Sequence, residues 1–233
     1  MNTTTVDILA FGAHPDDIEI GAGALVAKHT KNGYSVAFCH LTDAELSSNG
    51  TVELRKQEAK KAEAILGVEK SIYLGFPDRG LTGSKEQLSK MTQVIRKLRP
   101  RVVLAPYWKD RHPDHVQCSK MVTEAVFDAA IRKKETPGGE GAHRVEQVYY
   151  YFINHMGEAD VVVDVSDVYE LKKQALLAYR SQFSPGEGQV QTPLNQPAYL
   201  AMIQGRDQLW GQQIGARYGE GLVSPHPVKK DFL

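Results

Sequence analysis

The sequence is poor in cysteine, and its charges cancel. Only two cysteines, Cys39 and Cys118, occur among the 233 residues, which allows a single disulfide at most and favours free, buried thiols in a reducing compartment. Lys plus Arg and Asp plus Glu each number 28, so the formal net charge is zero. Nothing in this balance indicates a nucleic acid or an anionic membrane as partner, although it allows a local basic pocket for a small acidic ligand.

Long apolar runs are also missing. No stretch approaches the ~20 apolar residues that cross a bilayer, and residues 1–7 do not join a basic segment to an apolar one as a secretory signal does. We find no internal repeat, low-complexity tract or clear linker. With 42% apolar and 24% charged residues, the chain is expected to form one cytoplasmic domain over residues 1–233.

What is present is an alternation of short apolar runs with amphipathic stretches, which predicts a parallel sheet covered by helices on both faces. The first half is expected to form strands at 6–13, 35–41, 71–74 and 101–105 and helices at 20–31, 52–66, 86–98 and about 114–134. The second half is expected to form strands at 146–153 and 160–165, helices at 168–181 and 199–217, and a long Gly-, Pro- and Gln-rich loop at 184–197.

The predicted fold class is α/β, a Rossmann-like three-layer sandwich with a mainly parallel sheet. Right-handed crossovers favour the strand order 3-2-1-4, to which the C-terminal half adds further strands. In that order the first and fourth strands are neighbours. Their carboxyl ends border the crevice where open α/β sheets bind ligands.

Two histidine–carboxylate clusters follow these two strands. The cluster at 13–17 (Ala-His-Pro-Asp-Asp) comes directly after the first strand, and the cluster at 111–115 (Arg-His-Pro-Asp-His) comes a short loop after the fourth. Taken singly, either cluster is compatible with a turn that ends in an aspartate helix cap. Because the predicted strand order brings both to one crevice, the pair favours a metal site.

The ligand types suit a catalytic zinc ion, which keeps three protein ligands and one open position. His14 and Asp17 are three residues apart at a strand-to-helix turn and can face one ion, and His115 can add a third ligand from across the crevice. Spacing alone does not decide which histidine of the second cluster binds the metal. The same ligands also accept Fe²⁺, Co²⁺ or Mn²⁺.

The remaining residues of the clusters suit the chemistry of hydrolysis. Asp16 is adjacent to Asp17 and must point elsewhere, which places it to accept a proton from the attacking water. His112, as a cation, is expected to stabilise a tetrahedral oxyanion, with Asp114 orienting its ring. A Gly-Ala-Gly at 21–23 superficially suggests a nucleotide site, but close packing of helix on sheet explains these glycines better.

The motifs at 14–17 (His-Pro-Asp-Asp), 19–21 (Glu-Ile-Gly) and 112–115 (His-Pro-Asp-His) resemble the LmbE-like, or PIG-L, family of zinc-dependent N-acetylglucosamine deacetylases. Further blocks are similar to the bacillithiol-biosynthesis deacetylases of that family, at 43–51, 77–81, 110–115 and 181–183. The resemblance implies a Zn²⁺ enzyme that hydrolyses N-acetylglucosaminyl-malate to glucosaminyl-malate and acetate. It also implies a homo-oligomer, a trimer or a hexamer.

The family pattern assigns roles to individual residues of this chain. It implies that His14, Asp17 and His115 bind zinc, that Asp16 is the general base and that His112 is the electrostatic stabiliser. These roles agree with those that the spacing suggests.

The resemblance also implies that Arg55, Arg111 and Tyr199 contact the substrate. Arg111 directly precedes His112 and is suited to a malate carboxylate through its bidentate fork. Arg55 is equally compatible with a solvated arginine on a helix. Arg79 is a further candidate, for which a structural role in its turn is favoured.

Two other functions compete with this interpretation. One is a deacetylase for another N-acetylglucosamine conjugate, such as a chitobiose or an inositol-linked sugar. The other is a sugar- or nucleotide-binding module that has lost catalysis, against which the complete set of catalytic residue types weighs.

Overall fold

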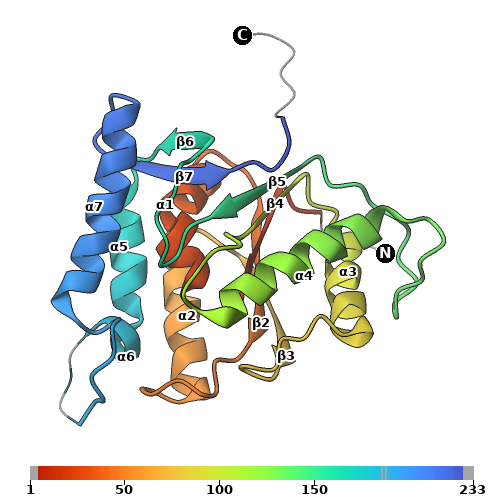
Figure 1. Cartoon of the computed structure of the whole chain (residues 1–233), viewed down its shortest axis with the longest axis horizontal. Coiled ribbons are helices and arrows are strands. Elements are labelled where there is room, and N and C mark those ends of the chain that lie inside the picture. Colours follow the sequence, from red (N-terminus) through yellow and green to blue (C-terminus); the bar gives the residue numbers. More distant parts are fainter. Residues whose placement is uncertain (1–4, 185, 187, 228–233) are drawn as a thin grey trace.

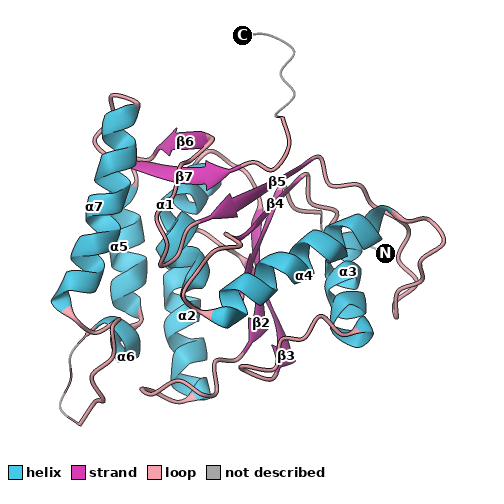
Figure 2. Ribbon diagram, viewed as in Figure 1, coloured by secondary structure: helices cyan, strands magenta, loops and turns pink. Residues whose placement is uncertain are grey.

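A computed structural model describes residues 5–184, 186 and 188–227, and Figures 1 and 2 show its elements. The strands are β1 (Ile8–Gly12), β2 (Val36–Thr42), β3 (Lys70–Phe76), β4 (Val102–Pro106), β5 (Gln147–Tyr151), β6 (Val161–Asp164) and β7 (Gly219–Val223). The helices are α1 (Asp17–Lys31), α2 (Val52–Leu66), α3 (Lys85–Leu98), α4 (Pro113–Ala130), α5 (Tyr169–Ala178), α6 (Arg180–Phe183) and α7 (Pro197–Gln213). Residues 1–4, which bear on the expected lack of a secretory signal, and positions 185 and 187 of the predicted loop lie outside the described residues.

One sheet contains all seven strands, in the order β3-β2-β1-β4-β5-β7-β6. β1 lies inside the sheet, where it pairs in parallel with β2 on one side and with β4 on the other. The predicted order 3-2-1-4 and the predicted α/β class are therefore confirmed. β4 and β5 are also parallel, whereas β7 runs antiparallel to both β5 and β6.

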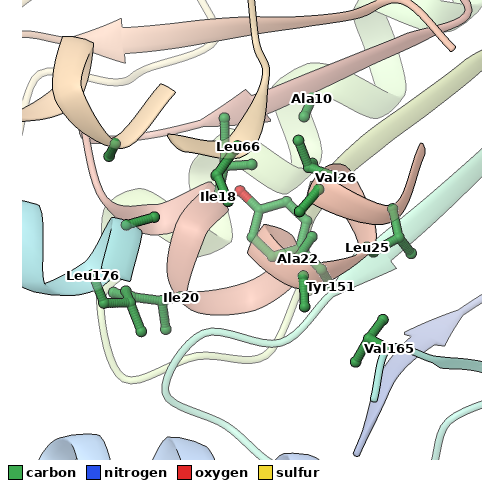
Figure 3. Packing of buried hydrophobic residues seen from close by; sticks show 14 of the residues in the cluster. Ala10, Ile18, Ile20, Ala22, Leu25, Val26, Leu66, Tyr151, Val165 and Leu176 are labelled. Atoms are coloured by element: carbon green, nitrogen blue, oxygen red, sulfur yellow. The ribbon is translucent and has the colours of Figure 1, made fainter. Parts of the chain in front are cut away.

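Helices cover both faces of the sheet, as Figure 1 shows. Side chains of β1 alternate between the two faces, because successive residues of a strand point to opposite sides. Ile8 and Ala10 join a buried cluster with α1, α2 and α5, part of which is drawn in Figure 3. Leu9 and Phe11 join a second cluster with α3 and α4. The three-layer sandwich that the sequence predicts is the observed architecture.

Strand β7 is the element that sequence reasoning missed. Two of its residues are glycine, which has low strand propensity. The glycines are needed because α7 and β6 come very close: a Cβ at Gly221 would lie 2.6 Å from the ring of Trp210, and one at Gly219 would lie 2.6 Å from Val162. Because close packing requires glycine at these two positions, β7 lacks the alternating apolar residues by which a strand is recognised in a sequence.

The predicted helix boundaries differ in accuracy, because only some helices have clear end signals in the sequence. α2 begins and ends where predicted, since Thr51 accepts a hydrogen bond from the Leu54 N–H at 3.2 Å and Gly67 ends it with a φ of 73°. The single helix expected at 168–181 is instead α5 followed by the short α6, and the one expected at 199–217 is α7, which ends at Gln213.

Two expectations about the whole chain can be compared with the described residues. Cys39 and Cys118 are both buried and free, as expected. Both belong to the cluster beneath α3 and α4. Within the part of the chain that the structure describes, no helix is both long and apolar enough to cross a membrane.

Candidate active site

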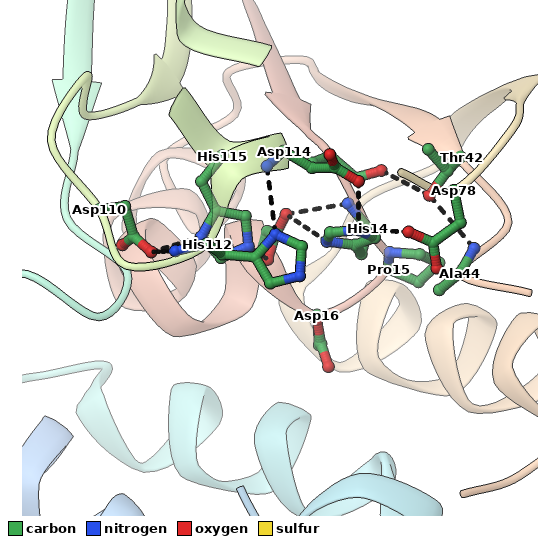
Figure 4. A network of polar contacts seen from close by, with 12 residues as sticks. His14, Pro15, Asp16, Thr42, Ala44, Asp78, Asp110, His112, Asp114 and His115 are labelled. Atoms are coloured by element: carbon green, nitrogen blue, oxygen red, sulfur yellow. Dashed lines mark hydrogen bonds and ion pairs between the residues drawn. The ribbon is translucent and has the colours of Figure 1, made fainter. Parts of the chain in front are cut away.

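The two histidine–carboxylate clusters meet at the carboxyl ends of β1 and β4 (Figure 4). The carboxylate of Asp17 lies between two imidazoles: its Oδ2 is 3.5 Å from His14 Nδ1 and its Oδ1 is 3.0 Å from His115 Nε2. All three side chains are buried, with 3–10% of their surface exposed. Asp17 therefore contacts both of the histidines with which it is predicted to bind a metal.

The site offers other ligand combinations as well. Ligand atoms of His14, His112 and His115 lie within 4.8 Å of one another, and so do ligand atoms of His14, Asp78 and Asp114. His14 belongs to both groups. Among the described residues, both groups therefore draw on the first cluster, and in one of them His112 and His115 of the second cluster stand together as candidate ligands.

Each of the two buried imidazoles that flank Asp17 also contacts a carboxylate through its other ring nitrogen. His14 Nε2 is 3.3 Å from Asp78 Oδ1, and His115 Nδ1 is 3.0 Å from Asp110 Oδ1. Metal-binding histidines usually have such a partner, which fixes the tautomer and the ring orientation. Sequence reasoning missed both aspartates, although Asp110 directly precedes the second cluster and Asp78 lies in the 77–81 block.

The charge of the site suits a cation. The pKa of His14 is raised well above its usual value: burial opposes the shift, but hydrogen bonds to Asp114, Asp17 and Asp78 outweigh it. The pKa of His115 is raised to about 9 in the same way, by Asp17 and Asp110 against the effect of burial. The surrounding carboxylates thus draw positive charge into the site, and a divalent ion with N and O ligands can supply it.

Asp16 lies beside this group in a strained main-chain conformation. Its φ is 106°, in the left-handed region that non-glycine residues rarely adopt, and it is 4% exposed. Burial raises the pKa of Asp16 to about 6, although the charge of Arg55, whose Nη2 lies 3.1 Å from Asp16 Oδ2, pulls the pKa down. A carboxylate with this pKa is suited to exchange protons near neutral pH.

Arg55 is not the solvated helix arginine that the sequence allowed. It is 3% exposed and donates hydrogen bonds to Asp16, to the Pro15 carbonyl and, at 2.9 Å, to Ser47 Oγ. It therefore holds the strained turn around Asp16, and it also lines a cavity beside the two clusters.

Two expectations for the second cluster need correction. The carboxylate of Asp114 does not orient His112; it accepts hydrogen bonds from the Arg79 main chain at 2.9 Å and the Arg79 guanidinium at 2.6 Å. His112 is oriented instead by the main-chain N–H of Asp114, which donates to His112 Nδ1 at 3.2 Å. Burial and the charges of His115 and His14 lower the pKa of His112, so a neutral ring replaces the expected cation. Because Nδ1 accepts, Nε2 carries the proton and can donate.

The clusters open into a cavity of about 280 Å³. The three predicted substrate-side residues, Arg55, Arg111 and Tyr199, line it together with Asp16. Tyr199 and Arg111 both donate to Asn154 Oδ1, at 2.9 and 3.2 Å. Asn154, which the sequence did not indicate, in turn donates through its main-chain N–H and its amide to Asp110.

Part of the long loop predicted at 184–197 forms one wall of this cavity. Its Thr192 and Leu194 line the cavity together with Ser47 and Ser48 of the segment that follows β2. Asn49 ties the two segments together: its amide donates to the Val190 carbonyl at 2.8 Å and accepts from the Val190 N–H at 2.9 Å. The described part of the loop is therefore built into the site.

Fold and site together define an α/β protein with a buried His–Asp cluster, suited to a cation, at the switch point of its sheet. The model of the PIG-L family, described as GlcNAc-PI de-N-acetylase, matches residues 9–126. The chain is also 32% identical over 228 residues to the diacetylchitobiose deacetylase of Thermococcus kodakarensis, with 92% of this chain and 81% of the relative covered. The chain belongs to the PIG-L family, and this places it among deacetylases of N-acetylglucosamine conjugates.

Two further matches extend the comparison. The "Probable N-acetyl-alpha-D-glucosaminyl L-malate deacetylase 2" of Bacillus subtilis is 29% identical over 193 residues, which cover 75% of this chain and 82% of the relative. A solved structure of a conserved protein from Thermus thermophilus is 38% identical, with a TM-score of 0.89 and 97% of each chain covered. Relatives that differ in the printed substrate thus match this chain at similar identity, and the comparisons support no single branch of the family.

Proposed function

We propose that this protein is a divalent-metal-dependent deacetylase that hydrolyses N-acetylglucosaminyl-malate to glucosaminyl-malate and acetate, as in bacillithiol biosynthesis. One arrangement carries the proposal: the carboxylate of Asp16 lies beside the group formed by His14, Asp17 and His115, at the base of a cavity that also contains Arg111. A binding module without catalysis has no use for a buried, strained carboxylate in that place.

In this proposal His14, Asp17 and His115 hold the metal, which is zinc or, with the same ligands, Fe²⁺ or Co²⁺. When bound, such an ion polarises the acetyl carbonyl and makes a water molecule more acidic. Asp78 and Asp110 keep the two imidazoles in their ligand orientation through the contacts at 3.3 and 3.0 Å.

The chain's own residues account for the proton transfers. Asp16 accepts a proton from the water as the water oxygen bonds to the acetyl carbon, and it returns the proton to the sugar nitrogen as the C–N bond breaks. His112 donates from Nε2 to the oxyanion, because its Nδ1 is already occupied by the Asp114 N–H. Arg55 restrains the turn on which Asp16 sits.

The assignment of a malate group to the substrate depends on Arg111. Of the three arginines that line the cavity, Arg55 pairs with Asp16 and Arg79 pairs with Asp114, whereas the described residues offer Arg111 only the neutral amide oxygen of Asn154. A guanidinium without a carboxylate partner is suited to an anionic group of the substrate. Tyr199 would donate to the same end of the substrate, since its hydroxyl shares the Asn154 oxygen.

A second candidate substrate is diacetylchitobiose, which the 32% identity to the Thermococcus kodakarensis enzyme favours. This sugar has no carboxylate, so it would leave Arg111 without an anionic partner. Turnover of the malate conjugate is therefore expected to depend on Arg111, whereas turnover of diacetylchitobiose is not.

Acetate release tests the proposal directly. The purified protein is assayed on N-acetylglucosaminyl-malate and on diacetylchitobiose, before and after removal of metal by a chelator and after Zn²⁺ is returned. We expect faster release from the malate conjugate, loss of activity with chelator and recovery with Zn²⁺. Release from neither substrate at any metal content would refute the deacetylase. A preference for chitobiose that Arg111→Met leaves unchanged would refute the malate assignment alone.

A further inference from the structure

Helix α1, which begins with Asp17, is broken in the middle. Ala22 has φ −144° and ψ 16°, which are not helical values, so residues 17–21 and 23–31 form two separate helical segments. The first segment carries Asp17 and directly follows Asp16. A break of this kind leaves main-chain donors and acceptors without their partners four residues away.

Two buried charged residues from the C-terminal part of the chain take up these free groups. Glu220 of β7 accepts hydrogen bonds from the N–H groups of Ala24 and Leu25, at 3.1 and 2.5 Å, at the start of the second segment. Arg206 of α7 donates to the carbonyl of Ile20, at 2.8 Å, near the end of the first segment. An anion thus caps the N-terminal end of one segment and a cation the C-terminal end of the other, as each helix dipole favours.

Their charges are balanced inside the protein. Lys172 of α5 donates to Asp207 Oδ2 at 2.7 Å and to Glu220 Oε1 at 2.6 Å, and Arg206 Nε donates to Asp207 Oδ1 at 3.0 Å. Lys172, Asp207 and Glu220 are completely buried, and Arg206 is 3% exposed. Two cations and two anions therefore form a closed network, in which the loss of one member leaves an unpaired buried charge.

Arg206 also reaches the other side of the site. Its Nη1 donates to the carbonyls of Phe152 and Ile153, both at 2.9 Å, at the end of β5. The next residue is Asn154, which donates to Asp110, and Asp110 contacts His115. One guanidinium therefore joins the main-chain segment that carries Asp17 to the segment that supports His115.

We propose that Lys172, Arg206, Asp207 and Glu220 form a positioning network for the metal site. The network fixes the two main-chain segments whose separation sets the distance between Asp17 and His115. None of the four residues lines the cavity, so they act through main-chain placement and not by contact with substrate. The inference rests on the proposed function, because it presupposes that Asp17 and His115 share an ion.

The chain contains a matched control for Arg206. Arg96 of α3 is also 3% exposed and also donates to main-chain carbonyls, among them those of Ala129 and Ile131 at 3.1 and 2.7 Å. It joins α3 to the end of α4 and does not line the cavity. Replacing either arginine by methionine removes a buried set of main-chain hydrogen bonds, but only one of the two sets holds the proposed metal site.

The test measures Zn²⁺ affinity of the metal-free protein by competition with a chromophoric chelator, alongside unfolding by denaturant. We expect Arg206→Met to weaken Zn²⁺ binding about 10- to 100-fold, the range seen when groups that orient metal ligands are removed. Arg96→Met should lose stability yet bind Zn²⁺ as the wild type does. Equal affinity in the two variants, whether both retained or both reduced, would overturn the proposal.

If Arg206→Met does not fold, the pair Arg206→Lys and Arg96→Lys decides the matter. Lysine keeps a positive charge, but its single nitrogen cannot take the places of the three guanidinium nitrogens that reach Asp207, the Ile20 carbonyl and the two carbonyls after β5. Weaker Zn²⁺ binding in Arg206→Lys alone supports the network, and wild-type affinity in it refutes the network. The readout needs no substrate, so a wild type that binds Zn²⁺ but releases no acetate would refute the deacetylase while leaving this result standing.

Discussion

At the scale of single residues, Asp16 combines burial, strain and a neighbouring cation. The left-handed main chain of Asp16 is held by Arg55, which donates hydrogen bonds to the Pro15 carbonyl and to the Asp16 carboxylate. Strain of this kind persists only where the surrounding structure determines it, and it is concentrated at functional sites. The carboxylate is thereby kept beside the proposed metal ligands without having to be one of them.

Replacing Asp16 by asparagine should separate catalysis from metal binding. The amide keeps the size of the side chain but cannot accept a proton, so we expect turnover to fall by about 10²- to 10⁴-fold. Zn²⁺ content, measured on the same preparation, should stay at the wild-type level. Asp160→Asn serves as the control, because Asp160 does not line the cavity and accepts a hydrogen bond from the Ser224 N–H. An Asp16→Asn enzyme of normal activity would remove Asp16 from the mechanism.

Asp110→Asn should affect the metal itself. Asp110 holds His115 Nδ1 at 3.0 Å, and partners of this kind typically change metal affinity by about 10- to 100-fold. Competition with a chelator measures the change, and Asp128→Asn, which removes only a contact to Lys134, provides the comparison. Unaltered Zn²⁺ affinity in Asp110→Asn would show that His115 needs no such support or is not a ligand.

Residues proposed to act directly were easier to predict than the residues proposed to support them. His14, Asp16 and Asp17 stand in one short motif at the end of a recognisable strand, so their chemistry can be read from their spacing. Asp78 reaches His14 from the loop after β3, and Asn154 reaches Asp110 from the end of β5. Such contacts depend on how loops from several strands pass one another, which no local pattern encodes.

At the scale of elements, the regular parts of the fold follow from periodicity and the irregular parts do not. α2 is predictable because a threonine cap and a left-handed glycine mark its ends. The break of α1 at Ala22 has no such local signal, since its free main-chain groups are satisfied by Arg206 and Glu220 from the other end of the chain. Tertiary contacts thus decide what local preference leaves open.

Gly21 of α1 shows how tightly these elements meet. A Cβ at Gly21 would lie 2.1 Å from the ring of Tyr151, so Gly21→Ala should destabilise the protein by about 1–3 kcal/mol, as overpacking does. Gly205 of α7 has open space in the same test, and Gly205→Ala should instead stabilise it by about 0.5–1 kcal/mol. Denaturant unfolding of both variants checks the pair. Equal effects would contradict the close packing of α1 on β5.

At the scale of the whole molecule, the sum of charges hides an uneven distribution. The chain has no formal net charge, yet five carboxylates, those of Asp16, Asp17, Asp78, Asp110 and Asp114, gather around the histidines of the site. Composition therefore gives no reason to expect a polyanionic partner, but it could not reveal that carboxylates gather at the site. Self-association as a trimer or hexamer stays a prediction, which light scattering of the purified protein can test.

Metal should stabilise the entire fold, since its proposed ligands follow two different strands, β1 and β4. Ligand at 100 times its dissociation constant adds about 2.7 kcal/mol if it binds only the folded state. For a chain of this size we expect the melting temperature to rise by about 5–10 °C. Thermal scans with Zn²⁺ and with chelator measure the shift. The same scans on a variant that lacks both His14 and His115 should show none.

The place of β7 in the sheet has a consequence for how the molecule is made. β7 is the last strand along the chain, yet it lies between β5 and β6 and supplies Glu220 to the break in α1. A ribosome therefore releases β5 and β6 well before the strand that joins them exists, and the emerging polypeptide exposes strand edges that can pair with other chains. The candidate site, whose lining residues lie between His14 and Tyr199, can reach its final geometry only once residues 219–223 have taken their place in the sheet.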